Sequence, residues 1–117
     1  MVSGPKAFLG GGNLNQVTGY QAGLVGGALN RANGQRSFVG GGRSNYATGY
    51  YSNIIGGRSN SVSDRYSTIG GGKSNLLSEK YQFIGNGLGN TATTRYSVIV
   101  GGVGNRAYGG ASFIGGG

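Results

Sequence analysis

Asparagine recurs at every fifteenth residue of this chain, seven times without interruption. The seven residues are Asn15, Asn30, Asn45, Asn60, Asn75, Asn90 and Asn105. A period this short and strict indicates that each repeat forms one unit, which buries its apolar side chains by stacking on the next unit. We number the positions of each unit from 1 to 15, with asparagine at position 15. The chain is then a single repeat domain, 1–117, with coils 1–15, 16–30, 31–45, 46–60, 61–75, 76–90, 91–105 and a partial coil 106–117.

Two positions of the repeat are apolar throughout and predict the core. Position 9 is aliphatic in every unit, from Leu9 to Ile114, and position 2 is apolar in every unit, from Val2 to Ala107. Glycine at positions 11 and 12, replaced only by Asn86, favours a turn, because glycine adopts positive φ at little cost. We expect two short strands per coil, roughly at positions 6–10 and 1–3. With 29 glycines and no helical period, the predicted fold is an all-β parallel β-solenoid, or β-roll, of about eight coils.

The repeated asparagines predict a stabilising ladder. Coils that stack in register place equivalent residues about 4.8 Å apart, which is the spacing of neighbouring strands in a sheet. Each side-chain amide would then bond its neighbours above and below, as asparagine ladders do in stacked β-structures. We therefore assign the seven asparagines a structural role.

Apolar residues outside the predicted core indicate association between chains. Position 8 lies on the opposite strand face from position 9, because strand side chains alternate. Five units nevertheless carry an apolar residue there: Phe8, Phe38, Phe83, Val98 and Phe113. Position 10 adds Val25, Ile55 and Val100. An exposed stripe of this kind is typical of an interaction surface, so we expect a homo-oligomer of solenoids packed side by side.

Segments 45–57 and 97–102, which read NYATGYYSNIIGG and SVIVGG, resemble YadA-like head repeats. The family motif is N-x-A-x-G, two spacer residues and then S-x-A/I-x-G, and the resemblance covers essentially the whole chain. It implies a left-handed parallel β-roll that packs as a homotrimer, as in the heads of trimeric autotransporter adhesins and in phage tail-fibre proteins. The period here is longer than the family's usual one, and the sequence contains no coiled-coil stalk or membrane anchor. A fibre module, or a fragment of a longer fibre, therefore fits better than a complete adhesin.

The basic residues, ten against two acidic ones, gather largely in two columns. Arg43, Arg58 and Lys73 share position 13 of consecutive coils, and Arg65, Lys80 and Arg95 share position 5. Stacking would make each set a cationic ladder, at some cost in like-charge repulsion. Such ladders would bind acidic polysaccharide, lipopolysaccharide phosphate or nucleic acid, or else keep the rods soluble and prevent lateral pairing of sheets. Nucleic acid is the weakest of these ligands, since no recognised binding motif accompanies the charge.

Tyrosine fills position 6 in four consecutive coils, as Tyr51, Tyr66, Tyr81 and Tyr96. An aromatic ladder of this kind would stack sugar rings, or it would seal the interface between chains with its hydroxyl groups at the wet edge. Position 6 would share a strand side with the phenylalanines of position 8, so we favour the interface.

Catalytic and metal-binding chemistry has few candidates in this chain. The only carboxylates, Asp64 and Glu79, occupy one turn position in consecutive coils, and each is followed by a cation. There is no histidine or cysteine to complete a nucleophile–base pair or a metal site. We therefore expect no enzymatic activity, no catalytic residue, no metal and no cofactor.

The expected function is that of a non-enzymatic structural and receptor-binding module. It would belong to a trimeric viral (phage) tail fibre or a bacterial surface adhesin, and would serve host attachment by binding anionic surface glycans. The alternative is the subunit of an extracellular filament that self-assembles by end-to-end stacking of solenoids. Residues 1–6 lack the apolar stretch of a signal peptide, and no apolar run reaches the ~18 residues that cross a bilayer. We expect no membrane insertion, and an extracellular location on a virion or cell surface would need an export route that this chain does not encode.

Overall fold

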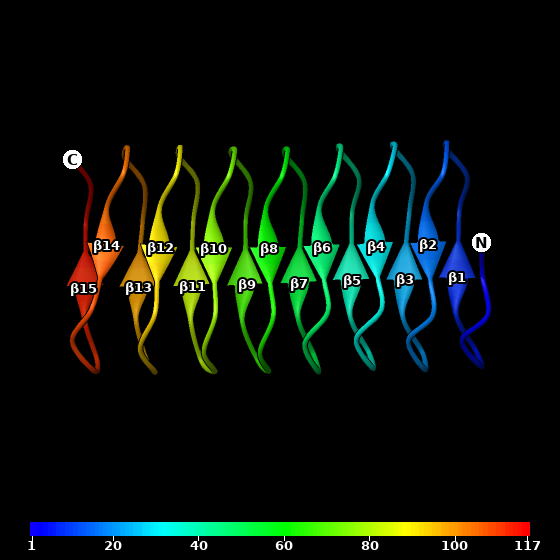
Figure 1. Ribbon diagram of the computed structural model, residues 1–117, viewed down its shortest axis with the longest axis horizontal. Coiled ribbons are helices and arrows are strands. Elements are labelled where there is room, and N and C mark those ends of the chain that lie inside the picture. Colours follow the sequence, from blue (N-terminus) through cyan, green and yellow to red (C-terminus); the bar gives the residue numbers. More distant parts are fainter.

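The chain winds into a flattened rod of stacked coils, as the computed structural model of all 117 residues shows (Figure 1). The rod measures 37 × 20 × 12 Å. Its length agrees with the roughly 38 Å expected for eight coils about 4.8 Å apart. The predicted all-β parallel solenoid with fifteen-residue coils is confirmed, because each coil contributes strands to two parallel sheets. No helix in the chain is long and apolar enough to cross a membrane.

Odd-numbered and even-numbered strands form separate sheets. The eight-stranded sheet contains β1 (Phe8–Leu9), β3 (Gly23–Leu24), β5 (Phe38–Val39), β7 (Asn53–Ile54), β9 (Thr68–Ile69), β11 (Phe83–Ile84), β13 (Val98–Ile99) and β15 (Phe113–Ile114). The seven-stranded sheet contains β2 (Gln16–Val17), β4 (Arg31–Ala32), β6 (Tyr46–Ala47), β8 (Ser61–Val62), β10 (Leu76–Leu77), β12 (Thr91–Ala92) and β14 (Arg106–Ala107). Every pairing joins a residue to the one fifteen positions later, so equivalent positions line up in columns along the rod.

The strands are shorter than the sequence predicted. Each contains only two residues, at positions 8–9 or 1–2. Position 6 cannot extend a strand, since all eight residues there have left-handed φ angles between 54° and 60°. Glycine at position 12, with φ between 88° and 130°, turns the chain after the odd-numbered strands. A third column of parallel bridges, at position 13 from Asn13 to Val103, was not predicted and ties the coils together at this turn.

The predicted core columns are confirmed. In the inner coils, every side chain at positions 2 and 9 is fully buried, with Val17, Leu24 and Ile54 among them. Position 7 places small or polar residues beside them, and the hydroxyl of Ser52 donates a hydrogen bond to the Gly49 carbonyl at 2.6 Å. The core is a single file of side chains between two sheets, so each coil depends on its neighbours for burial.

Asn60 illustrates how the asparagine column joins the coils. Its side-chain nitrogen donates to the carbonyls of Gly56 in its own coil (3.2 Å) and Gly72 in the next (3.0 Å). Its side-chain oxygen accepts the backbone N–H of Asn75 at 3.0 Å. The same three bonds recur from Asn15 to Asn90. The amides therefore bond the backbone of adjacent coils rather than one another, and they satisfy turn groups that no strand reaches.

Glycine at position 12 leaves room for these bonds. A Cβ atom on Gly57 would lie 2.2 Å from the Gly72 carbonyl oxygen and 2.6 Å from Asn60 Nδ2. Gly57 also has a φ of 96°, which residues with a side chain rarely adopt. A Cβ on the preceding Gly56 would meet no atom within 4 Å. The geometry therefore requires glycine at position 12 but not at position 11, where Asn86 is accommodated.

Replacing Asn60 by alanine should lower the free energy of unfolding by about 3 kcal/mol, because the Asn75 N–H and the Gly56 carbonyl lose their partners. Urea denaturation followed by far-UV circular dichroism measures this change. Asn53→Ala in the same coil is the matched control, since that side chain makes only one 3.3 Å bond to the Tyr51 carbonyl. The control should change stability by less than about 0.5 kcal/mol. Equal losses in the two variants would contradict the role assigned to Asn60.

Adjacent glycines should respond in opposite ways to alanine. Gly57→Ala should destabilise the rod by about 4 kcal/mol or more, since the new methyl group overlaps the Gly72 carbonyl and the backbone is strained. Gly56→Ala should leave stability unchanged or raise it by up to about 1 kcal/mol, through lower entropy of the unfolded chain. Thermal unfolding of the two variants side by side gives the comparison. A tolerant position 57 would show that the ladder does not need this close approach.

Candidate functional site

The outer side of the eight-stranded sheet is apolar along its length. Phe8, Phe83 and Phe113 at position 8 are 60%, 40% and 70% exposed. Where position 8 is glycine or asparagine, position 10 carries Val25 or Ile55, and both are more than half exposed. We call the outward residues of positions 8 and 10 the apolar face. Soluble proteins seldom leave a continuous stripe of this kind in water, so it is a candidate interaction surface.

The two positions of the apolar face complement each other. Every phenylalanine at position 8 is followed by glycine at position 10, and its ring covers that glycine. Cε1 of Phe38 and of Phe83 lies 3.5 Å from the place where a Cβ on Gly40 or Gly85 would be. Each coil except the one with Thr68 thus presents at least one large apolar side chain at one of the two positions. The sequence predicted that both columns are apolar. That a ring at position 8 covers the glycine at position 10 depends on the direction in which the ring points, which only the structure gives.

The four tyrosines of position 6, here called the Tyr ladder, form a continuous stack: Tyr51, Tyr66, Tyr81 and Tyr96. Successive ring centroids lie 5.3, 5.4 and 5.2 Å apart, with planes within 13° of parallel. The rings contact one another, so no sugar fits between them, and only the outer side of Tyr96, next to Ala111 in the following coil, is open. At the other end, the Arg36 guanidinium lies 5.4 Å from the Tyr51 ring centroid and donates to its hydroxyl, which raises the pKa of Arg36.

The Tyr ladder lies at a turn, and not on the strand beside the phenylalanines. The expectation that positions 6 and 8 share a strand side is wrong, because the left-handed backbone at position 6 ends the strand. Tyr50 adds edge-on contacts to the Tyr51 and Tyr66 rings, at centroid distances of 4.5 and 5.9 Å. Desolvation by this cluster raises the pKa of Tyr50. The rings therefore join successive coils within one chain.

Substitution of Tyr81 should separate ring stacking from backbone strain. Tyr81→Ala removes stacking on both sides and keeps a left-handed residue with a Cβ, whereas Tyr81→Gly removes the same stacking and relieves the strain. The glycine variant should therefore be more stable than the alanine variant by about 1 kcal/mol. The same pair at Phe83, on strand β11, should show the opposite order, because glycine weakens an extended strand. Denaturant titration of the four variants measures both differences, and the same order at the two sites would refute the explanation.

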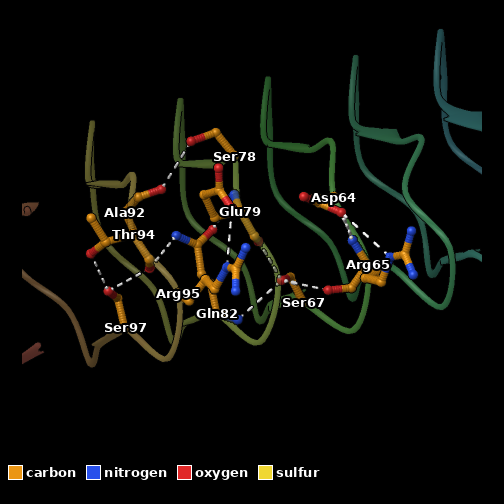
Figure 2. Close-up of polar contacts among 10 residues, drawn as sticks. All are labelled: Asp64, Arg65, Ser67, Ser78, Glu79, Gln82, Ala92, Thr94, Arg95 and Ser97. Carbon is orange, nitrogen blue, oxygen red and sulfur yellow. Dashed lines mark hydrogen bonds and ion pairs between the residues drawn. The ribbon is translucent and has the colours of Figure 1, made fainter. Parts of the chain in front are cut away.

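The cations of position 5 carry their own counter-charges (Figure 2). Asp64 Oδ1 lies 3.8 Å from Arg65 Nε, and Glu79 Oε2 lies 4.0 Å from Arg95 Nε of the next coil. Glu79 therefore pairs across coils with Arg95, although Lys80 follows it directly in the sequence. Exposed pairs of this kind contribute less than about 1 kcal/mol to stability, but they offset two of the three positive charges at position 5 and leave only Lys80 without an ion pair.

The two carboxylates belong to a hydrogen-bonded turn rather than to a pocket. The Ser67 hydroxyl donates to the Glu79 carbonyl at 3.0 Å, and Gln82 Nε2 donates to the Thr94 carbonyl at 2.8 Å, so these turns are linked from coil to coil (Figure 2). Nowhere in the chain do three histidine, cysteine, aspartate or glutamate side chains gather in a group that could hold a metal ion.

The cations of position 13 lie on the other long edge of the rod, in the turns that follow the odd-numbered strands (Figure 1). Arg43, Arg58 and Lys73 are all exposed, and none of them takes part in either ion pair of the chain. A serine with left-handed φ follows each: Ser44 (56°), Ser59 (57°) and Ser74 (58°). We call these six residues the cation–hydroxyl edge. Its positive charge is uncompensated, in contrast to the edge that holds Arg65 and Arg95.

The fold does not demand serine at position 14. Leu14 and Leu29 occupy this position in the first two coils, and Gly89 and Gly104 occupy it after the cationic coils. Gly89 keeps the same backbone conformation, with φ of 66°. A side chain on a left-handed residue costs about 1 kcal/mol relative to glycine, so the three serines are not there for the backbone. The sequence signal for this pairing was the threefold repeat G-[RK]-S-N, in which a serine follows the cation each time.

A cleft of about 260 Å³ lies near Met1 and was not predicted. It is lined by Met1, Leu14, Asn15, Gln16, Leu29, Arg31 and Tyr46. The Arg31 guanidinium lies 5.1 Å from the Tyr46 ring centroid, so its charge makes a cation–π contact with that ring. The exposed leucines of position 14 were the only sequence sign of this apolar hollow.

The chain matches no known family model, and no curated protein is significantly similar to it in sequence. The resemblance to YadA-like head repeats therefore stays a prediction from the motif. The chain presents three distinct surfaces, which are the apolar face, the Tyr ladder edge and the cation–hydroxyl edge.

Proposed function

We propose that this protein is a non-enzymatic structural and receptor-binding module of a trimeric extracellular fibre, in a viral (phage) tail fibre or a bacterial surface adhesin. The observation that carries the proposal is the apolar face, an exposed apolar stripe on one side of a rigid rod. Its large side chains recur from Phe8 in the first coil to Phe113 in the last, so the stripe extends along most of the 37 Å length.

Burial of the apolar face against copies of the same chain is the simplest way to remove it from water. Each chain presents the same stripe in the same register, so copies can pack side by side around a shared axis in a closed assembly. The alternation of ring and glycine gives the stripe relief, because a Phe83 ring beside Gly85 leaves a shallow site for a neighbouring side chain. The number of chains, three, comes from the resemblance of the motif to YadA-like heads.

The rod itself supports a role in attachment. Parallel bonding between all coils, together with the asparagine column, makes the solenoid stiff enough to project a surface from a virion or cell. Three equivalent surfaces in one particle raise the effective concentration of each weak contact with an array of receptors. Such a device needs no catalytic group, and the two carboxylates of this chain are engaged in turns and ion pairs.

Light scattering on the purified protein should give the mass of three chains, and replacement of large residues of the apolar face should reduce it. The double variant Phe38→Ser/Phe83→Ser removes two rings from the apolar face and should yield monomers. Leu14→Ser/Val103→Ser is the matched control, because these residues are at least as exposed, 74% and 66%, but lie outside the apolar face. A wild-type protein that is monomeric and stable at all concentrations would overturn the proposal.

A self-assembling filament is the second candidate. Strands β1 and β15 each have one neighbour, so the eight-stranded sheet has two unpaired edges of matching pattern. Addition of one rod to the end of another would pair these edges. A particle mass that grows steadily with concentration, and lengthening rods in negative-stain micrographs, would favour this candidate over the trimer.

A further inference from the structure

We infer that the cation–hydroxyl edge binds a linear acidic polysaccharide, one whose chain carries a carboxylate on each sugar, and that the edge with Arg65, Lys80 and Arg95 does not. This inference rests on the proposed function, since it names the ligand class and the surface for receptor binding. It separates two sets of cations that have the same composition, two arginines and one lysine in consecutive coils.

The positive charge of the cation–hydroxyl edge is uncompensated. Arg43, Arg58 and Lys73 are exposed, and no carboxylate lies within ion-pair distance of any of them. Both acids of the chain lie on the other edge, where they pair with Arg65 and Arg95. An anionic ligand would have to displace these partners from Arg65 and Arg95 and would find only Lys80 without one, whereas all three cations of the cation–hydroxyl edge are free of carboxylates.

Serine coincides with a cation in each coil of this edge. Among the seven complete coils, serine occurs at position 14 in the three that have a cation at position 13, and in no other. The hydroxyls of Ser44, Ser59 and Ser74 make no hydrogen bond within the chain, although other hydroxyls do, such as those of Ser52 and Ser67. Each rung of this edge therefore offers one cation and one free hydroxyl, which together suit a carboxylate and a neighbouring sugar hydroxyl.

The cations of this edge are also regularly spaced. Backbone bridges join Arg43 to Arg58 and Arg58 to Lys73, so the rungs are held in register about 4.8 Å apart. A linear uronic-acid polymer repeats its carboxylate once per sugar, on a length scale comparable with this step. The edge thus presents three similar contacts to three successive sugars, and the coils hold them in place before binding.

Nucleic acid suits this edge less well than polysaccharide. Single strands bind on aromatic platforms, and the six residues of the edge include no aromatic ring. The aromatic stack lies on the opposite edge, and its inner faces are occupied by neighbouring rings at 5.2–5.4 Å. The one charge per about 3.4 Å of each duplex strand also falls out of step with the rungs.

Packing through the apolar face would leave the cation–hydroxyl edge open. The outward residues of that face are at positions 8 and 10, while the edge is formed at positions 13 and 14, after the glycine turn. A side-by-side assembly would then display one such edge per chain, and all copies would run in the same direction along the fibre.

Two triple variants test the inference with matched charge. Arg43→Gln/Arg58→Gln/Lys73→Gln and Arg65→Gln/Lys80→Gln/Arg95→Gln each lower the formal net charge from +8 to +5. Their Kd values for polygalacturonate, a linear uronic-acid polymer, are measured by calorimetry at physiological salt. The first variant should bind about tenfold more weakly or worse, because it loses three charge-assisted hydrogen bonds. The second should change by less than about twofold, since charges across a 20 Å wide rod are screened.

Equal weakening of both triple variants would overturn the inference, because binding would then follow net charge alone. Failure of the wild-type protein to bind polygalacturonate would overturn it as well. Ser44→Ala/Ser59→Ala/Ser74→Ala should weaken binding by about threefold without altering its salt dependence, since no charge is removed. A single-stranded oligonucleotide of equal charge should compete poorly. If it displaces polygalacturonate at equal concentration, the edge is a general polyanion site and the polysaccharide assignment is wrong.

Light scattering on the same samples keeps this inference distinct from the proposed function. Both triple variants should retain the particle mass of the wild-type protein, since their substitutions lie outside the apolar face. A trimer that fails to bind polygalacturonate would refute the edge assignment and leave the fibre proposal intact. A monomer that binds polygalacturonate through Arg43, Arg58 and Lys73 would refute the trimeric fibre and support the edge.

Discussion

The hydrogen bonds of the asparagine side chains are the interaction on which the rest of this rod depends. Two-residue strands leave most of each coil outside any sheet, and at the glycine turn the carbonyl of position 11 and the N–H of position 15 would be unpaired without an added donor and acceptor. Asn45, for example, supplies both: its amide bonds the Gly41 and Gly57 carbonyls and accepts the N–H of Asn60. The strict period follows, because one inserted residue would move an amide out of reach of the next coil.

The same constraint separates the parts of the repeat that are fixed from those that vary. Positions 2, 9, 12 and 15 face inward or touch the next coil, and their residue types hardly change. Positions 1, 5, 13 and 14 face water, and they vary in blocks of neighbouring coils, as position 14 does from Leu29 to Ser44 to Gly89. A solenoid turns such blocks into patches, because consecutive coils are neighbours in space. The distinct surface patches of this rod therefore arise where the outward residues of neighbouring coils differ from the rest of the repeat.

Much of the fold followed from the sequence, since periodicity in apolar residues and asparagine fixes a parallel stack. The strand ends did not, because left-handed backbone at position 6 occurs with tyrosine, arginine and lysine alike and has no residue signature. The candidate surfaces were predicted as columns, but not their internal contacts. Glu79 has Lys80 beside it in sequence and Arg95 beside it in space, and only the three-dimensional arrangement selects the second. Stacking of Tyr66 on Tyr81 likewise removes the open ring faces that sugar binding would need.

A rod only 12 Å thick has two faces and two edges, and each is constrained in its own way. The outer side of the eight-stranded sheet carries the exposed side chains of the apolar face. The other sheet presents mixed residues, and hydroxyls such as those of Thr48 and Ser78 bond the next coil at 3.3 Å. One edge is closed by its own ring stack and ion pairs. The cation–hydroxyl edge combines exposure, free donors and a fixed spacing in three consecutive coils, and we therefore propose it, rather than the other edge, as the site for an anionic ligand.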